Sequence, residues 1–400
     1  MRILMITNNY ADRTRGGVEM HVHNLSHALV VAGHEVTVAR TSQGPSIHEL
    51  DLQVPVVPVL GHSSAKDQRM SNKLSNIPLV RFASNFLGRI TTAIKAGRRL
   101  REDPEFLAAF DIIHHHDFIT SAIVARMLRG IAIKQIWTNH LGEFLILRRL
   151  PVVGPILTRY LTRTFDAGIG PSGELSDPTT VSCPIEYIPN GVNIDAFAPL
   201  SSTDRNLLRA KRGLGQNDLI AIVPRRWAPT KGVLFAAEAM SSEHWPSNCS
   251  VIFAGAGETE FPEYSSEIRE ALTAAVASFE IVDTLSMGEM AEALQGADIC
   301  IIPSLMEATS LSALEAMAVC LPIVSTDVGG LPEIVHDGVN GHLVPSADAK
   351  AIALAVANIC RLSADERQKM GSVSRTQVVS TYSWDEIGAR TLKVYREVSV

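Results

Sequence analysis

The chain has 400 residues, of which 46% are hydrophobic and 20% charged, and its formal net charge is −6. This is the composition of an ordinary globular protein, and the length exceeds what one hydrophobic core usually serves, so we expect two domains. No stretch predicts a transmembrane helix, and the first residues lack the apolar run of a secretory signal. The five cysteines occur singly, without C-x-x-C spacing, which indicates reduced thiols in a cytosolic compartment.

The first elements predict a nucleotide-binding type of fold. Residues 2–7 form an apolar strand that leads into a turn-rich loop and then a helix over residues 20–31. Gly16 and Gly17 lie in the loop, where backbone N–H groups without neighbouring side chains can approach a phosphate closely. A flexible turn is the alternative for this glycine pair. Residues 35–39 form the second strand and complete a βαβ unit.

Charge is distributed unevenly along the chain. Residues 1–200 hold 20 Lys and Arg against 17 Asp and Glu, whereas residues 201–400 hold 16 against 25. The bias is sharpest between residues 62 and 101, where Asp67 is the one acid. The cations of this stretch are Lys66, Arg69, Lys73, Arg81, Arg89, Lys95, Arg98, Arg99 and Arg101. Apolar residues lie among them, so the stretch predicts either an amphipathic helix that binds an anionic membrane or a solvated surface helix.

Histidines end two of the next predicted strands. The segment DIIHHH at 111–116 indicates a strand, and because consecutive residues alternate faces, its three histidines cannot together ligate one metal. No carboxylate stands at metal-ligand spacing beside them, so we expect no metal there. Residues 131–137 form another strand, which delivers His140 to the end where α/β folds place their ligands. A structural role is the alternative for His140.

The second half opens after the segment PNGVNIDAFAP at 189–199, which we interpret as the connection between domains. Residues 219–223 form a strand that runs into PRRWAPTKG. Arg226 and Lys231 lie across a turn in this loop, so two cations stand at the carboxyl end of the strand, and phosphate is their simplest ligand. Arg225 is an alternative to Arg226, because a one-residue shift of the loop would exchange them.

The strand at 251–254 ends in GAGE, which begins with Gly255. A Gly-x-Gly after a strand is a weak nucleotide signal, and this one lacks the third glycine of a dinucleotide fingerprint. An NAD-dependent dehydrogenase is therefore a less favoured hypothesis.

A strand, a loop and a helix between residues 299 and 318 carry the strongest functional signal. The hydroxyl of Thr309 or Ser310 can cap the helix, because either can accept from an unpaired N–H of its first turn. Glu315 lies inside the apolar helix, where an unpaired carboxylate is costly to bury. Glu307 precedes it by eight residues, so two carboxylates flank a helix N-terminus that favours anionic ligands. The alternative is that Glu315 pairs with a core cation while Glu307 is solvated.

The spacing Glu-x7-Glu in PSLMEATSLSALEAMA, followed by LPIVSTDVGGLPEIV and DGVNGHLVP, resembles the donor-site signature of the family-four retaining glycosyltransferases. The resemblance covers essentially the whole chain and is strongest from 185 to 345. It implies the GT-B fold, an α/β architecture in which two doubly wound Rossmann-like domains face across a cleft. Residues 1–195, with a C-terminal helix at 382–400 crossing back, would bind the acceptor. Residues 196–381 would bind the nucleotide-sugar donor.

The same resemblance implies roles for single residues. The donor-binding residues would be Gly16, Gly17, Arg226, Lys231, Gly255, Glu307, Ala308, Thr309, Ser310, Leu311 and Glu315. The catalytic residues would be His140, Arg226, Lys231 and Glu307. Within these sets, Glu307 would face the sugar and Glu315 the ribose, while Arg226 and Lys231 hold the pyrophosphate and His140 approaches the sugar from the acceptor side.

The chain departs from the family pattern at several positions, among them Asn193, which replaces the usual Asp of the connecting segment. Ala308 and Ser310 stand where the family usually has glycines, which leaves the sugar preference open. Cys320 stands where the family commonly has a glycine before Leu-Pro, and we expect a slightly different helix end, because cysteine tolerates a left-handed backbone less well.

The implied activity is the transfer of a hexose from a UDP- or GDP-sugar to a glycan, a lipid-linked acceptor or a small molecule, with retention of anomeric configuration. The chain has no D-x-D triplet, so a metal-bridged diphosphate is not expected. We expect no cofactor besides the donor and no nucleic-acid partner. The expected location is the cytoplasm, with peripheral attachment to the inner face of the membrane as an option. A non-enzymatic sugar-nucleotide sensor on the same fold is the alternative function.

Overall fold

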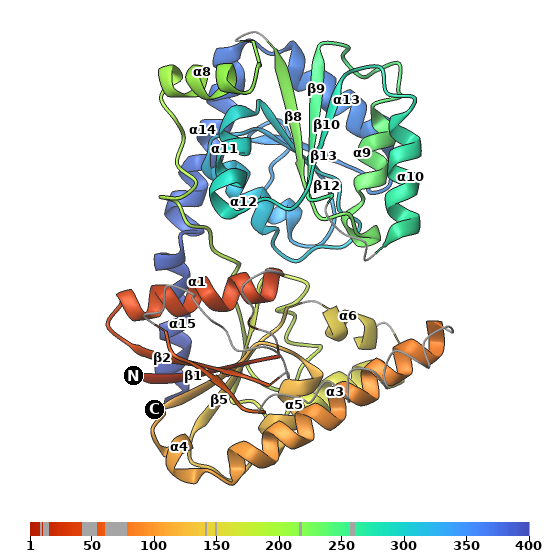
Figure 1. The fold of residues 1–400 in the computed structure, drawn as a ribbon. Helices are drawn as coiled ribbons and strands as arrows, with labels where there is room; N and C mark the ends of the chain where they lie inside the picture. Colours follow the sequence, from red (N-terminus) through yellow and green to blue (C-terminus); the bar gives the residue numbers. More distant parts are fainter. Residues whose placement is uncertain are drawn as a thin grey trace. The chain divides into compact units, whose positions relative to one another are not determined.

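The computed structural model describes residues 1–8, 10, 16–41, 54–60, 78–140, 142–148, 150–215, 218–256 and 261–399, without the side chains of 78–86, 142, 143 and 146. The chain divides into two compact units. Unit 1 is Met1–Pro189 with Ile387–Val400, and unit 2 is Asn190–Glu386. Each unit is built on one parallel sheet with helices on both faces, which confirms the predicted α/β class (Figure 1).

The sheet of unit 1 has the order β3-β2-β1-β4-β5-β6-β7, and all its neighbouring strands are parallel. Its strands are β1 (Arg2–Thr7), β2 (Glu35–Arg40), β3 (Val56–Pro58), β4 (Ile112–His115), β5 (Lys134–Thr138), β6 (Ala167–Gly170) and β7 (Ile185–Tyr187). The chain leaves β1 toward β2 on one side and later fills β4 on the other. The sheet therefore reverses its winding between β1 and β4, which makes the carboxyl ends of these strands a usual place for a ligand.

Helices cover both faces of this sheet. They are α1 (Gly17–Val31), α3 (Pro78–Arg101), α4 (Pro104–Ala108), α5 (Ile119–Met127), α6 (Gly142–Arg148), α7 (Val153–Thr162) and the part of α15 (Trp384–Ser399) that follows Ile387. Leu4 and Ile6 of β1 pack on one face with Leu100 of α3 and Val124 of α5. Helices α1 and α15 lie close together, and a Cβ at Gly388 would be 3.3 Å from the Cβ of Ala28. No described helix is long and apolar enough to span a membrane.

The sheet of unit 2 has the order β10-β9-β8-β11-β12-β13 and is also parallel. Its strands are β8 (Leu219–Pro224), β9 (Cys249–Ala254), β10 (Phe279–Val282), β11 (Ile299–Ile302), β12 (Ile323–Thr326) and β13 (Gly341–Val344). Winding reverses between β8 and β11, so their carboxyl ends are the corresponding ligand position in this unit.

Alternate residues of β8 enter two different cores. Ala221 and Val223 pack toward α9 (Val233–Ala239), α10 (Pro262–Leu272) and α13 (Ala349–Arg361). Ile220 and Ile222 pack toward α11 (Met287–Gly296), α12 (Leu311–Ala318) and α14 (Ala364–Thr381). Figure 1 shows these helices as two layers on either side of the strands. A strand that is buried on both faces reads as a continuous apolar run, as the sequence of β8 does.

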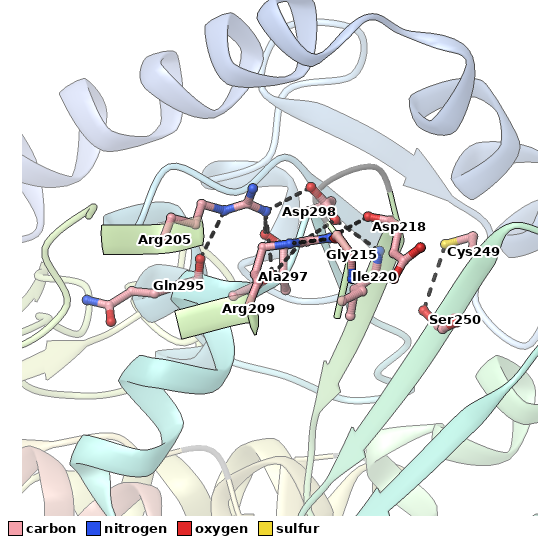
Figure 2. A network of polar contacts seen from close by, with 11 residues as sticks. Arg205, Arg209, Gly215, Asp218, Ile220, Cys249, Ser250, Gln295, Ala297 and Asp298 are labelled. Atoms are coloured by element: carbon pink, nitrogen blue, oxygen red, sulfur yellow. Dashed lines mark hydrogen bonds and ion pairs between the residues drawn. The ribbon is translucent and has the colours of Figure 1, made fainter. Parts of the chain in front are cut away.

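An ion-pair network fixes α8 (Ser202–Lys211) to the amino ends of β8 and β11 (Figure 2). Arg209 is fully buried, and its Nη1 lies 3.1 Å from Asp298 Oδ2 and donates to the carbonyl of Gly296 at 2.8 Å. Arg205 Nη2 lies 2.8 Å from the other oxygen of Asp298. Asp298 Oδ2 also accepts from the backbone N–H of Ile220 at 3.0 Å. These contacts hold β8 and β11 together at their amino ends.

Candidate functional site

Glu307 lies in the loop between β11 and α12, at the carboxyl end of the sheet in unit 2. Its side chain is buried, and Ser304 Oγ donates to its Oε2 at 3.3 Å. The helix that follows begins after Ser310, whose hydroxyl accepts from the N–H of Ala313 at 3.3 Å. Of the two capping residues left open by the sequence, Ser310 therefore fills the position. The remaining first-turn N–H groups of α12 have no acceptor within the helix.

Two cations meet the carboxylate of Glu307. Lys231 Nζ lies 3.0 Å from Glu307 Oε2, and Arg225 Nη2 donates to the same oxygen. Arg225 also donates to Ser304 Oγ and Ser310 Oγ, both at 3.0 Å. Two cations and one anion leave the cluster with a surplus of positive charge, which suits an anionic ligand.

The charges of the cluster set the pKa values of its members. Burial alone would raise the pKa of Glu307, but the charges of Arg225 and Lys231 outweigh burial and lower it to about 2. Burial and the neighbouring Arg225 lower the pKa of Lys231 to about 8. At neutral pH Glu307 is therefore ionised and Lys231 is largely protonated.

The side chains of Arg225 and Arg226, which follow β8, have different environments. The sequence favoured Arg226 as the phosphate ligand and kept Arg225 as the alternative. Arg225 is 6% exposed and belongs to the cluster around Glu307, whereas the side chain of Arg226 is exposed. The Nε of Arg225 is buried and has no hydrogen-bond partner among the described residues. The structure thus brings Arg225, and not Arg226, together with Lys231 and Glu307.

Glu315 lies in α12 and is half-buried. Its carboxyl group makes no hydrogen bond or ion pair with any residue in the described part of the chain. Loss of hydration raises its pKa to about 7, although the charge of Arg225 acts in the opposite direction. The alternative drawn from the sequence was a paired Glu315 and a solvated Glu307, and the structure shows the reverse. The carboxyl group of Glu315 can therefore accept hydrogen bonds from a ligand that carries hydroxyl groups.

Glycines let the loops around Glu307 approach one another. Gly329, in the segment DVGG, has a φ of +55°, and a side chain there would overlap the carbonyl oxygen of Glu307. Gly232 has a φ of +64°, and a side chain there would overlap the carbonyl of Pro303. Leu305 N–H donates to the carbonyl of Thr230 at 2.9 Å, which ties the Lys231 turn to the Glu307 loop. Neither glycine was predicted as a site residue from the sequence, although the glycine pair in DVGG was the available signal.

The remaining donor residues expected from the sequence lie in three places. Ala308 and Thr309 are buried beside Glu307, and Leu311 begins α12. Gly255 follows β9 with a φ of +108°, and its carbonyl accepts from Trp227 N–H at 3.2 Å, so it lies beside the Arg225 loop. Glu258, the end of the GAGE motif, lies outside the described residues. Gly16 and Gly17 belong to unit 1, where they are the N-cap and first residue of α1.

Unit 1 gathers histidines at the carboxyl ends of β1, β4 and β5. His114 lies 2.6 Å from Tyr395 Oη and 2.7 Å from Thr138 Oγ1, whereas His115 points to the other face and contacts Gln135 at 3.1 Å. His116 Nδ1 lies 3.2 Å from His140 Nε2. Burial lowers the pKa of His114, His116 and His140 well below the usual value, so these rings are neutral at neutral pH. His140 thus belongs to a cluster that the sequence did not predict, because its members come from separate elements.

Two family models match the chain. Residues 15–196 match the model described as Glycosyltransferase Family 4, and residues 217–361 match the model described as Glycosyl transferases group 1. Alpha-maltose-1-phosphate synthase of Mycobacterium tuberculosis is 30% identical over 223 residues, which are 54% of this chain and 57% of that protein. The chain thus matches little more than half the length of that relative. The protein with the same name from Mycolicibacterium smegmatis is 25% identical over 420 residues and the match covers 100% of both chains.

Solved structures show the same architecture. Sucrose-phosphate synthase from Thermosynechococcus elongatus matches with a TM-score of 0.78 at 19% identity, covering 99% of this chain and 98% of that one. Anabaena HepE, solved in complex with UDP-glucose, matches with a TM-score of 0.73 at 16% identity, covering 99% and 100%. At such identities the likeness shows the fold, which is the predicted GT-B fold with two Rossmann-like domains.

Proposed function

Because the chain belongs to the family-four glycosyltransferases, we propose that it transfers a hexose from a nucleoside diphosphate sugar to an acceptor with retained anomeric configuration. The observation that carries this proposal is the cluster of Arg225, Lys231 and Glu307 beside the N-terminus of α12. It offers positive charge, unpaired N–H groups and a carboxylate within one short segment. Such a set fits a ligand that joins a diphosphate to a polyhydroxylated ring.

In this proposal Arg225 and Lys231 hold the diphosphate, with exposed Arg226 as the competing ligand. They neutralise the charge that develops on the leaving group, and because the cluster is already assembled, little reorganisation is required. Glu307 faces the hexose. Glu315, which has no partner among the described residues, accepts from the ribose hydroxyls. Unit 2 is then the donor domain.

Unit 1 is proposed as the acceptor domain, with His140 at the reacting sugar. The acceptor is a glycan, a lipid-linked sugar or a small molecule. The acceptor hydroxyl attacks the sugar on the same face from which the diphosphate departs, and the leaving diphosphate takes the proton of that hydroxyl. The transfer therefore needs no side-chain nucleophile. It also needs no metal ion, since Arg225 and Lys231 supply the positive charge.

The first test is binding followed by turnover. A thermal-shift panel of UDP-, GDP- and ADP-sugars should show stabilisation by one nucleotide class, and transfer with that donor should proceed in EDTA and yield the same anomeric configuration. Stabilisation without transfer to any acceptor and without donor hydrolysis would favour a sugar-nucleotide sensor. No stabilisation by any nucleotide would contradict both.

The second test separates the two carboxylates. Glu315→Ala should mainly raise the KM for the donor, because ribose contacts are uniform along the reaction, whereas Glu307→Ala should mainly lower kcat. Equal and small changes in both constants for both variants would show that the carboxylates have a structural role only.

A further inference from the structure

Three histidines from three separate segments converge in unit 1. His21 lies in α1, which follows β1, while His116 follows β4 and His140 follows β5. Since β1 pairs with β4 and β4 pairs with β5, the carboxyl ends of these strands are neighbours. Each histidine offers one ring nitrogen, and the three nitrogens lie within 4.8 Å of one another. His21 and His116 are buried and His140 is half-buried.

The contacts of His116 determine which of its nitrogens carries the proton. Its Nε2 lies 3.0 Å from Met5 Sδ, and a thioether sulfur can only accept a hydrogen bond. The proton is therefore on Nε2, and Nδ1 presents its lone pair toward His140 Nε2, 3.2 Å away. Two imidazole nitrogens on one tetrahedral zinc ion are roughly 3.3 Å apart, given bonds of about 2.0–2.1 Å. A ligand histidine also usually donates its second N–H to a neighbour, as His116 does to Met5.

The composition of the cluster indicates which ions it suits. Among the described residues the cluster contains three imidazoles and no carboxylate, and each imidazole can offer a ring nitrogen to a metal ion. Imidazole ligands favour zinc, cobalt, nickel and copper over magnesium and calcium, which prefer oxygen. His114 is not part of the set, because both its nitrogens already contact Tyr395 and Thr138.

We propose that His21, His116 and His140 form a binding site for one divalent cation of the zinc class. Three protein ligands leave a fourth position of a tetrahedral ion for water or another ligand. Only one of the three consecutive histidines at 114–116 takes part, since strand geometry sends His115 to the opposite face. The site does not depend on the transferase proposal. If that proposal holds, the ion occupies His140 and inhibits transfer.

The test is direct metal binding to the full chain. Protein freed of metal with a chelator is titrated with Co²⁺, followed by its visible absorption, and with Zn²⁺ by calorimetry. We expect one equivalent of either ion and a zinc-dependent rise in Tm. We expect each of the variants His21→Gln, His116→Gln and His140→Gln to bind the ion about 100-fold or more weakly. Loss of a residue that only hydrogen-bonds to a metal ligand already lowers metal affinity by about 10–100-fold, and loss of a ligand should cost at least as much. His27→Gln, an exposed histidine on the same helix, is the matched control and should bind as the wild type does.

Folding of each variant is checked by circular dichroism and by its Tm without metal. If His116→Gln does not fold, the half-buried His140→Gln decides the question together with His21→Gln. Absence of stoichiometric binding to the wild type would overturn the proposal. Binding that persists unchanged in His21→Gln and His140→Gln would place the ion elsewhere, for example on a cysteine, and would overturn it equally.

Discussion

Glu307 and Glu315 come from one short segment, yet their carboxyl groups have opposite environments. Arg225 and Lys231 hold the pKa of Glu307 to about 2, whereas burial without a partner raises the pKa of Glu315 to about 7. The first carboxylate therefore stays charged throughout the physiological range. The second changes its charge within that range, so any ligand that hydrogen-bonds to it should bind in a pH-dependent way.

We predict that affinity for the nucleoside diphosphate rises between pH 6 and pH 8 because Glu315 becomes a better acceptor of ribose hydroxyls as it loses its proton. Glu315→Gln should remove the part of the pH dependence that comes from Glu315. The phosphate titrates in the same way in both measurements, so the ratio of the wild-type Kd to the variant Kd removes its effect. Isothermal titration calorimetry across this range measures it. Glu292→Gln, an exposed glutamate of α11, is the control. A constant ratio across the range would show that Glu315 does not contact the ligand.

The same shift affects the stability of the free protein. The folded-state pKa of Glu315 lies above its unfolded value of 4.5, so the folded protein binds more protons between those two values. Its contribution to the free energy of unfolding is therefore lost as pH rises from about 4.5 to about 7. Glu307 acts in the opposite sense, because its depressed pKa stabilises the fold above pH 4.5 and this contribution is lost as pH falls toward 2.

The two arginines after β8 give a second prediction for single residues. Arg225→Ala should cost about 2–4 kcal/mol in transition-state stabilisation, as for other preorganised charges that face a developing anion. Arg226→Ala, with its exposed side chain, is the neighbouring comparison. Measurements of kcat/KM and of nucleoside diphosphate affinity for both variants test the assignment. A larger loss of kcat/KM and of nucleoside diphosphate affinity in Arg226→Ala would assign the diphosphate contact to Arg226.

Among the elements, α8 depends on one buried side chain. Arg209→Met removes the guanidinium that pairs with Asp298 and donates to three backbone carbonyls, and breaking a buried pair costs about 3–5 kcal/mol. Urea unfolding followed by tryptophan fluorescence should show this loss in the free energy of unfolding. Lys211→Met, at an exposed position in the same helix, should change it by less than about 0.5 kcal/mol. Equal effects of the two substitutions would show that the network is not a stabilising contact.

Many elements could be predicted from the sequence because buried parallel strands appear as short apolar runs. Strands β1, β8 and β11 lie where those runs are. Helix α11 begins at Met287, where Ser286 and Glu289 form a capping box that the sequence shows as a Ser followed three residues later by a Glu. The strand expected at 131–137 begins at Lys134. Short edge strands such as β3 were missed, because three residues give little periodicity.

The candidate site was predictable where its residues are close in sequence. Glu307 and Ser310 belong to one loop, so spacing alone placed them together. Which of Arg225 and Arg226 enters the cluster depends on how their loop packs against Gly255, whose carbonyl accepts from the N–H of Trp227. This contact joins residues far apart in the sequence, so it could not be predicted from a local pattern. Cys320 was expected to alter the end of α12, and it adopts a φ of +65°, the left-handed conformation that a glycine usually fills.

For the molecule as a whole, the uneven charge predicts an anionic partner for unit 1. The described part of α3 buries Ala93, Ala96 and Leu100 and exposes a row of cations. These exposed cations are Arg89, Lys95, Arg98, Arg99 and Arg101. Lys66, Arg69 and Lys73 lie outside the described residues, as do the side chains of Arg81, Phe82 and Phe86. The described part of the helix is therefore amphipathic, with its cations on the face opposite the buried residues.

We predict that the chain sediments with anionic vesicles and not with neutral ones. Each cation near an anionic leaflet is worth about 1 kcal/mol, so several together give a reversible attachment that salt reverses. The double change Arg98→Glu and Arg99→Glu should reduce sedimentation. Lys211→Glu with Arg212→Glu, an exposed pair in unit 2, should not. Failure to sediment at low salt would favour a soluble acceptor and a solvated face.

The discontinuity of unit 1 has a consequence for synthesis. Unit 2 is one continuous stretch, whereas unit 1 requires Ile387 and the residues after it, which supply Tyr395 to the buried His114. On the ribosome, unit 2 can fold as soon as it has emerged, whereas unit 1 lacks the part of its packing that α15 supplies until that helix has emerged. A nascent chain that ends just before Ile387 and is followed by a linker long enough to fill the ribosomal tunnel should therefore carry a protease-resistant unit 2 and a protease-sensitive unit 1, although unit 1 was translated first.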